Sequence, residues 1–122
     1  MDVADLARDW IEAWNARDID RVLAHFTEDA RFISPRAQEV TGDPVVRGHD
    51  ALRSYWTAAL PRLGETRFEL VQAVWDTSAA TLVIVYDRLS GNGRARACEL
   101  LRLENGRATS GEAMYGATLP GD

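Results

Sequence analysis

The apolar residues at the start of the chain recur at helical spacing. Between residues 3 and 14 they fall at i, i+3, i+4, i+7, i+8 and i+11, at positions Val3, Leu6, Ala7, Trp10, Ile11 and Trp14. This spacing predicts an amphipathic helix of about four turns. Residues 15–17 end that helix, and Asp18 is placed to cap a short second helix whose apolar stripe ends at Phe26. A strand over residues 30–34 is expected next, with Glu28 and Asp29 in the turn that precedes it.

The stretch from residue 35 to residue 48 holds two prolines and two glycines. It is interpreted as a long loop, and a loop of this length in a small domain is often a functional flap or lid. A third helix is expected from His49 or Asp50 to about Leu60, where Pro61 blocks its continuation. The buried face of that helix would carry Leu52, Tyr55 or Trp56, and Ala59.

From Thr66 onward the apolar period changes from 3.6 to 2, which indicates strands. Four strands are expected, over residues 66–75, 80–89, 94–103 and 107–116, separated by turns at 76–78, 91–93 and 105–106. Asn105-Gly106 is typical of a type I′ hairpin, because both residues accept positive φ. The order of elements predicts an α+β fold, a cone-shaped α+β barrel with three N-terminal helices packed on a strongly curved, mainly antiparallel sheet. Such a cone leaves a cavity.

Size and charge limit the classes of function that fit this chain. Its 122 residues allow one domain, 1–122, with a single core. The net charge of −5 and the absence of a basic stripe argue against a nucleic-acid partner. No apolar run reaches the roughly 18 residues needed to span a bilayer, and no signal peptide is recognised, so no membrane association is expected. Cys98 is the only cysteine, which excludes an internal disulfide and favours a cytoplasmic location.

Glu99 is the residue that most suggests chemistry. In the strand over residues 94–103, alternate positions share one face, and Glu99 is the only charged residue on the face formed by Ala95, Ala97, Leu101 and Leu103. A carboxyl buried on an apolar face must be neutralised or find a hydrogen-bond donor. Two interpretations stand side by side: a structural bond to an arginine or a tyrosine hydroxyl, or a proton-transfer group in a pocket.

The other titratable residues give weaker signals. Tyr86 and Asp87 point to opposite faces of one strand, and both faces are apolar, so the pattern does not decide which of the two reaches the cavity. Asp87 beside Arg88 is more typical of a solvated charge at a strand end. His25 and His49 are far apart and in no ligand spacing, so no metal or other cofactor is expected, and His25 is interpreted as a partner of the second helix's C-terminal end.

Aromatic residues are numerous for a chain of this length. Trp and Tyr are most often core residues, but they also line ligand pockets because each brings a polar group. The partner expected for such a pocket is a small apolar molecule. The candidate lining residues are Trp10, Trp14, Phe32, Ser34, Tyr55, Trp56, Tyr86 and Tyr115, with Trp75 a further aromatic residue outside this set.

Four segments together resemble a known family. They are WIEAWNARDIDRVLAHFTEDARFISP (10–35), RGHDALRSYW (47–56), CELLRLENGR (98–107) and the late aromatic residue Tyr115. The chain resembles the nuclear transport factor 2-like superfamily, and within it the small bacterial SnoaL-like proteins, over about residues 6–117. The resemblance implies the fold described above. It does not imply one function, because this fold carries isomerases, epoxide hydrolases, polyketide cyclases, dehydratases and transport factors.

Comparison with ketosteroid isomerase, a member of that superfamily, bears on three positions. By resemblance, its oxyanion-hole tyrosine corresponds to Trp10, its general-base aspartate to Ser34, and its protonated aspartate to Glu99. Serine is a poor base near neutral pH, so the isomerase route is not supported. The adjacent pair Asp87 and Arg88 likewise does not reproduce the Asp–Arg–Asp set of limonene epoxide hydrolase.

Two hypotheses of function follow from the sequence. The first is a cofactor-free acid–base enzyme of cyclase, isomerase or hydrolase type, in which Glu99 moves a proton and Tyr115 or Tyr55 donates a hydrogen bond. The second is a non-catalytic domain that binds a ligand or pairs with itself. An open sheet face carrying Val, Leu and Arg predicts a homodimer in either case.

Overall fold

Helices precede a four-strand meander along this chain, as the hydrophobic pattern predicts. The computed structural model describes residues 2–91 and 93–120, so Asn92, within the turn expected at 91–93, lies outside the described residues. The helices in the described part are α1 (Val3–Asn15), α2 (Ile19–Leu23), α3 (Pro35–Thr41) and α4 (His49–Leu63). The strands are β1 (Phe26–Ile33), β2 (Val45–Arg47), β3 (Arg67–Asp76), β4 (Thr81–Ser90), β5 (Gly93–Glu104) and β6 (Arg107–Leu119).

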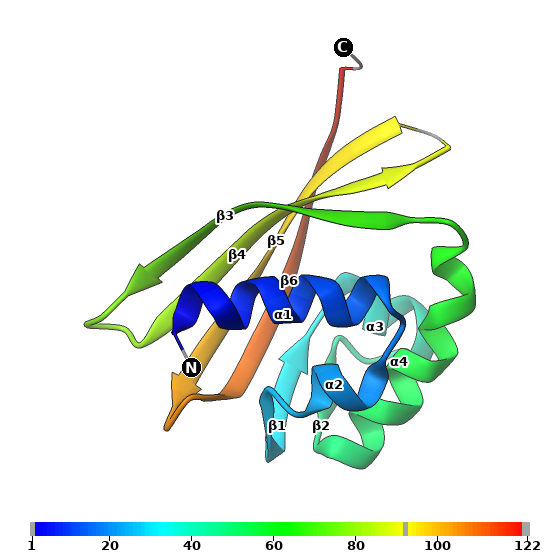
Figure 1. Cartoon of the computed structure of the whole chain (residues 1–122). Helices are drawn as coiled ribbons and strands as arrows, with labels where there is room; N and C mark the ends of the chain where they lie inside the picture. Colours follow the sequence, from blue (N-terminus) through cyan, green and yellow to red (C-terminus); the bar gives the residue numbers. More distant parts are fainter. Residues whose placement is uncertain (1, 92, 121–122) are drawn as a thin grey trace.

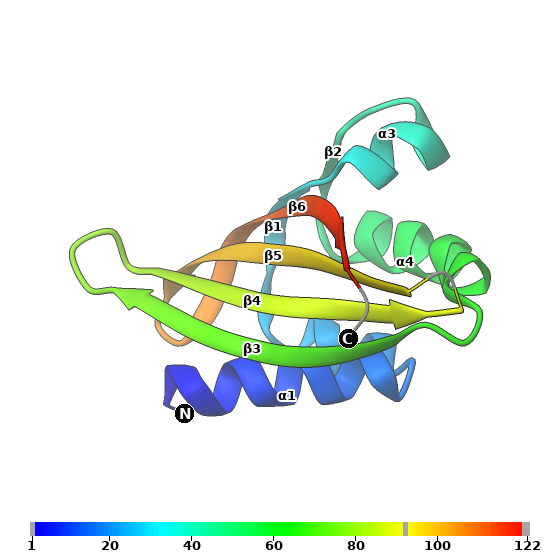
Figure 2. The same ribbon diagram turned by 90° about the horizontal axis from the view of Figure 1, so that it is seen from above.

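The strands form one mixed sheet in the order β2-β1-β6-β5-β4-β3. Strands β3 to β6 pair antiparallel in chain order, whereas β1 lies parallel to β6 and antiparallel to β2. Helix α1 lies across one face of the curved sheet (Figure 1), and the view from above shows it running alongside β3 (Figure 2). The α+β class with helices on a strongly curved, mainly antiparallel sheet is therefore confirmed.

The β5–β6 turn and one position on β6 depend on glycine. Asn105 and Gly106 form the β5–β6 turn with φ of 52° and 81°, as the type I′ prediction requires. Gly111 pairs with Phe32 of β1, and a Cβ there would lie 2.9 Å from the Phe32 ring. The Phe32 ring can therefore pack onto β6 only because Gly111 has no side chain.

Helix α1 is fixed at both of its ends. Its N-cap Asp2 accepts a hydrogen bond from the Ala4 amide at 3.1 Å. At the other end, the Asn15 side chain donates to the Phe68 carbonyl at 2.9 Å and accepts from the Phe68 amide at 2.8 Å. Asn15 thus satisfies both backbone groups of Phe68 and joins the end of α1 to β3.

The expected cap of α2 is confirmed, but its expected end is not. The Asp18 carboxylate accepts from the Arg21 amide at 3.1 Å. The helix ends at Leu23, and Phe26 is fully buried at the start of β1. Glu28 and Asp29, expected in a turn, are exposed residues of that strand. Pairing with β6 explains the difference, since the Ala108 amide donates to the His25 carbonyl at 2.7 Å and extends strand pairing back to this point.

The prediction of a long loop over residues 35–48 is wrong, because this segment forms α3 and β2. Ser34 is the N-cap, accepting from the Arg36 amide at 3.1 Å, and Pro35 occupies the first turn. Proline fits there because its missing N–H would have no helical partner and its φ is already helical. Gly42, with φ of 84°, ends the helix. The Ser-Pro pair therefore starts a helix where the sequence reading expected a break.

Helix α4 runs past Pro61 to Leu63. A proline in the last turn removes one backbone hydrogen bond, and the helix ends soon afterwards. The residues expected on its buried face are all buried: Leu52, Tyr55, Trp56 and Ala59. Among the helices of the described residues, none is long and apolar enough to cross a membrane.

Candidate functional site

A cavity lies between α1, α4 and the sheet, as the lining residues show. Its walls include Trp10 and Trp14 from α1, Tyr55 and Trp56 from α4, and residues of β1, β4, β5 and β6. About 70 Å³ of the cavity is open to the centres of water-sized groups. A single water needs roughly 10–15 Å³ on this measure, so the space holds about five waters.

The structure brings nearly all of the predicted lining residues to this cavity. Those that border it are Trp10, Trp14, Phe32, Tyr55, Trp56, Tyr86 and Tyr115. Trp14 and Trp56 pack edge to face with ring centroids 5.4 Å apart, and Trp10 and Tyr86 pack at a tilt with centroids 5.8 Å apart. Ser34 is fully buried and is not among the residues that border the cavity.

Glu99 lies on the cavity wall and is only 3 % exposed. The Tyr86 hydroxyl donates to its Oε2 at 2.9 Å, and within the described part of the chain this is the one hydrogen bond the carboxyl makes. Burial raises the pKa of Glu99 to about 8, while the Tyr86 hydrogen bond and the charge of Arg88 act in the opposite direction. At neutral pH the carboxyl is therefore mostly protonated, and a small rise in pH ionises it.

The side chains of Tyr86 and Asp87, which are neighbours on β4, lie on opposite faces of the sheet. Tyr86 borders the cavity, so the question left open by the alternating pattern is resolved in its favour. Asp87 pairs with Arg96 of β5 across the sheet, and its carboxylate accepts from Arg94 at 2.6 Å and from Arg96 at 2.5 Å. The prediction that Asp87 is a solvated charge is wrong, since its side chain is only 4 % exposed. Burial acts to raise the pKa of Asp87, but the two arginine hydrogen bonds outweigh it and the pKa is lowered.

A second set of hydroxyl groups lies around Ser34. Its Oγ is 3.3 Å from the Tyr55 hydroxyl and also caps α3. Burial raises the pKa of both Tyr55 and Tyr115, and a hydrogen bond with Ser34 acts against that rise in each case. The hydroxyl that donates to Glu99 is that of Tyr86. The role of Tyr115 or Tyr55 as hydrogen-bond donor in the reaction stays a prediction.

Two arginines at the cavity were missed by sequence reasoning. Arg88 of β4 and Arg36 of α3 both line it, and their guanidinium carbons lie 4.8 and 5.3 Å from the centroid of the Tyr115 ring. These distances are in the range of cation–π contacts. The signal for Arg88 was present, because it is two residues from Tyr86 and therefore shares its face of the strand. Arg36 lay in the segment misread as a loop.

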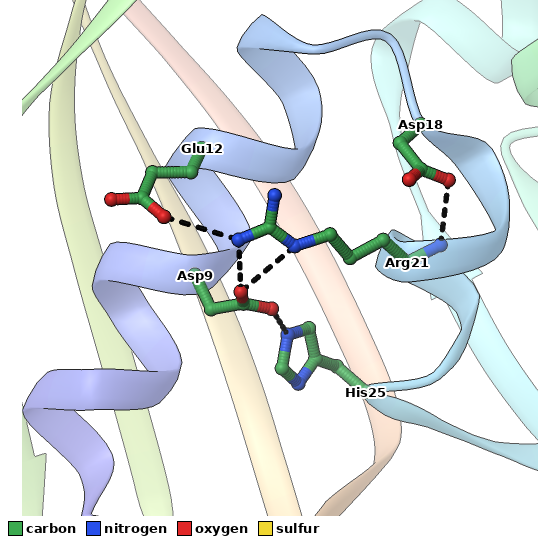
Figure 3. Close-up of polar contacts among 5 residues, drawn as sticks. All are labelled: Asp9, Glu12, Asp18, Arg21 and His25. Carbon is green, nitrogen blue, oxygen red and sulfur yellow. Dashed lines mark hydrogen bonds and ion pairs between the residues drawn. The ribbon is translucent and has the colours of Figure 1, made fainter.

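A separate polar cluster joins α1 to α2 (Figure 3). The His25 Nε2 lies 2.6 Å from the Asp9 carboxylate, and Arg21 donates from Nε to the other Asp9 oxygen at 2.9 Å and from Nη2 to Glu12 at 3.1 Å. Burial acts to raise the pKa of Asp9, but the bonds from Arg21 and His25 outweigh it and the pKa is lowered. The His25 ring thus forms a hydrogen bond with a carboxylate of α1, and not with the C-terminal end of α2 as expected. None of these residues borders the cavity.

Comparisons with known proteins place the chain in a family. The solved structures that it resembles include a SnoaL-like protein of unknown function from Burkholderia thailandensis, with 25% identity, 94% of each chain covered and a TM-score of 0.83. A nuclear transport factor 2-like protein of unknown function from Burkholderia pseudomallei has 24% identity, 94% and 92% coverage and a TM-score of 0.77. TerC, crystallised with polyporic acid, has 17% identity, 93% and 90% coverage and a TM-score of 0.72. No curated protein matches the sequence.

The family itself is shown by a sequence model. The model for the SnoaL-like domain matches residues 7–111, which is most of the chain. The likenesses under 25% identity show the same fold. The resemblance seen in the sequence is confirmed: this chain belongs to the SnoaL-like domain family of the nuclear transport factor 2-like superfamily.

Proposed function

We propose that this protein is a cofactor-free acid–base enzyme acting on a small, mostly apolar ligand held in the cavity. The observation that carries the proposal is the Glu99 carboxyl, which is buried on an aromatic wall, bonded by Tyr86 and has a pKa near 8. A group whose pKa lies close to the working pH both gives and takes protons readily. A member of the same fold, TerC, was crystallised with polyporic acid, so a ligand in this fold has precedent.

The proposed step uses one carboxyl group as a proton shuttle. With a pKa near 8, about a tenth of the molecules hold Glu99 as carboxylate at pH 7. That carboxylate takes a proton from a carbon that lies between a carbonyl and a C=C bond of the ligand, and the electron pair moves to the carbonyl oxygen to give a dienolate. Glu99 then returns the proton to the far carbon of the C=C bond as the double bond shifts into conjugation, so the reaction is an isomerisation with no net gain or loss. The Tyr86 hydroxyl stabilises the carboxylate form of Glu99, which is the form that takes the proton.

Deuterium exchange into a cyclic ketone tests the proposal without knowledge of the natural substrate. Cyclohexanone in D₂O is followed by NMR with wild type, Glu99→Gln and Glu104→Gln, the last an exposed glutamate of the same strand. Wild type should speed exchange over buffer, with a rate that rises up to about pH 8. Glu99→Gln should lose at least about 100-fold, in the range of general acid–base effects, and Glu104→Gln should retain the rate.

Two outcomes would contradict the proposal. Equal exchange with wild type and Glu99→Gln would remove Glu99 from the reaction. No acceleration by wild type would remove acid–base catalysis on ring ketones and favour the alternative function.

That alternative is a non-catalytic ligand-binding domain. It is favoured by Ser34, which occupies the position of the isomerase base and is engaged in capping α3 and bonding Tyr55. In that case ligands raise the melting temperature of wild type and Glu99→Gln alike, and mass spectrometry detects no product.

The homodimer stays a prediction. Large apolar side chains that are exposed on the sheet are consistent with it: Val71, Val74 and Trp75 of β3 and Met114 of β6. A monomer in size-exclusion chromatography would contradict it.

A further inference from the structure

Three buried hydrogen-bond donors at the cavity have no acceptor in the protein. They are the indole Nε1 groups of Trp10 and Trp14 and the Nε of Arg88, none of which has a partner among the described residues. All three residues border the cavity. Leaving a buried donor unpaired is costly, and folded proteins seldom keep several together. The common property of these groups is that each can only donate, so their complement is a ligand rich in acceptor atoms.

The charges at the cavity also favour a ligand that is rich in acceptor atoms. Six of the described arginines have a carboxylate within 4 Å, namely Arg8, Arg21, Arg53, Arg62, Arg94 and Arg96. Neither Arg36 nor Arg88 is among them, although both are only partly exposed. Both guanidinium groups contact the same ring, that of Tyr115, with their carbons 5.3 and 4.8 Å from its centroid.

The acid at the cavity does little to neutralise these two arginines. Glu99 is the one carboxyl among the residues that border the cavity, and it is mostly protonated at neutral pH. The cavity is therefore locally positive in a protein whose net charge is −5. A carboxylate suits such a place, because two guanidinium groups offer it charge-assisted hydrogen bonds.

The walls of the cavity limit the rest of the ligand. They are mainly indole and phenol rings. A flat or chair-shaped apolar ring fits between such walls.

From these observations we infer that the cavity binds a small aromatic or alicyclic carboxylate, with its anionic group at Arg36 and Arg88 and its ring among the tryptophans. This inference shares the cavity with the proposed function and names its ligand class, but it depends on the two arginines and not on proton transfer by Glu99. The carboxylate of such a ligand would also supply an acceptor for the unpaired Nε of Arg88.

Matched neutral and charged probes test the inference. Benzoate and benzamide have the same ring and nearly the same size, and they differ in charge. Binding at pH 7 is measured by isothermal titration calorimetry and by quenching of tryptophan fluorescence, since three of the lining residues are tryptophans. We expect wild type to bind benzoate at least about tenfold more tightly than benzamide, with cyclohexanecarboxylate and its amide giving the same order, and added salt should weaken only the acids.

Variants locate the anionic group. Arg36→Met combined with Arg88→Met keeps much of the side-chain length and should lower benzoate affinity at least tenfold while leaving benzamide unchanged. Arg53→Met is the matched control, because Arg53 is an exposed arginine of α4 that pairs with Asp20 away from the cavity, and it should change neither. The probe comparison on wild type stands even if the double variant does not fold.

The outcomes separate this inference from the proposed function. Benzamide binding as tightly as benzoate, or saturable binding of neither probe, would overturn the ligand class while leaving the exchange test of Glu99 unaffected. Benzoate binding unchanged in a folded double variant would overturn the role of Arg36 and Arg88. Conversely, Glu99→Gln should still bind benzoate, so a failure of proton transfer leaves the inference standing.

Discussion

Two acids buried in the same sheet have pKa values shifted in opposite directions. Glu99 of β5 and Asp87 of β4 are each only 3 % exposed. Glu99 faces the aromatic cavity, receives one hydrogen bond from a neutral hydroxyl and has a pKa raised to about 8 by burial. Asp87 faces the other side, receives bonds from Arg94 and Arg96, and has a pKa below its ordinary value.

The difference lies in what each acid contacts, because the two are about equally buried. A neutral donor offsets only part of the cost of desolvating a charge, whereas two guanidinium groups replace the lost hydration. Asp87 therefore remains a fixed charge that joins β4 to β5. Glu99 remains able to change its protonation state near neutral pH, which is the property an acid–base group needs.

Among these substitutions, replacing Glu99 by Gln should change the pH dependence of the free energy of unfolding the most, by removing it. Below pH 4.5 Glu99 is protonated in folded and unfolded states alike and contributes no pH dependence. Between pH 4.5 and about 8 the unfolded chain releases the proton and the folded chain keeps it, so wild-type stability falls as pH rises. At about 1.4 kcal/mol per pKa unit the loss reaches a few kcal/mol. Glu99→Gln should lack this decline, as measured by urea unfolding at pH 5 and pH 9.

The control for that experiment is Glu104→Gln, which removes an exposed carboxyl from the end of the same strand. It should follow the wild-type pH dependence. A wild-type stability that is flat from pH 5 to pH 9 would contradict the raised pKa of Glu99.

Replacing Asp87 by Asn should destabilise the protein by about 2 kcal/mol at pH 7, because two charge-assisted hydrogen bonds are lost. The pKa of Asp87 is lowered on folding, so its contribution is present above its ordinary value of 3.8 and disappears as pH falls through the folded value. Chemical unfolding at pH 7 and at pH 2.5 measures this. A penalty of the same size at both pH values would show that the charge is not responsible.

Replacing Tyr86 by Phe should have a smaller effect on stability, about 1 kcal/mol, since one hydrogen bond to a mostly neutral carboxyl is removed. The informative readout is the pKa of Glu99, followed by the chemical shift of its ¹³C-labelled carboxyl. Because the Tyr86 bond lowers that pKa, the variant should titrate at a higher pH than wild type. A pKa that falls instead would show that Tyr86 does not donate to the carboxylate.

The smallest effect is expected at an exposed ion pair. Arg53 and Asp20 join α4 to α2, with side chains 50 % and 77 % exposed. Surface pairs of this kind contribute under about 0.5 kcal/mol, since water and salt screen them. Arg53→Met should therefore leave the melting temperature nearly unchanged, and a loss comparable with that of Asp87→Asn would mean that burial is not what separates the two pairs.

Elements with a strong local pattern were predicted well. The stripe of α1, the Asp18 cap and the Asn105-Gly106 hairpin are set by residues close in sequence, and the structure has them as expected. Elements that depend on distant partners were not. The start of β1 is set by pairing with β6, some 80 residues further along the chain, and α3 was hidden because proline marks the first turn of a helix as well as its end.

The candidate site was predicted in part for the same reason. Glu99 and the aromatic residues stand out through their chemistry and their alternation along strands and helices. Their mutual contacts do not, because whether Tyr55, Tyr86 or Tyr115 reaches Glu99 depends on strand register and on the curvature of the sheet. Asp87 shows the converse, since its partners Arg94 and Arg96 lie on the next strand and become neighbours only through register.

By itself, then, the sequence determined the fold class and the presence of one acid on an apolar face, because periodicity and turn chemistry are local properties of the chain. It also indicated the family, through the resemblance of four segments to known members. Tertiary structure alone decided which tyrosine donates to Glu99 and which arginines border the cavity. It also turned Ser34-Pro35 from an apparent strand end into the cap of α3. These outcomes depend on distances between residues far apart in the chain, and only the packed sheet and helices fix those distances.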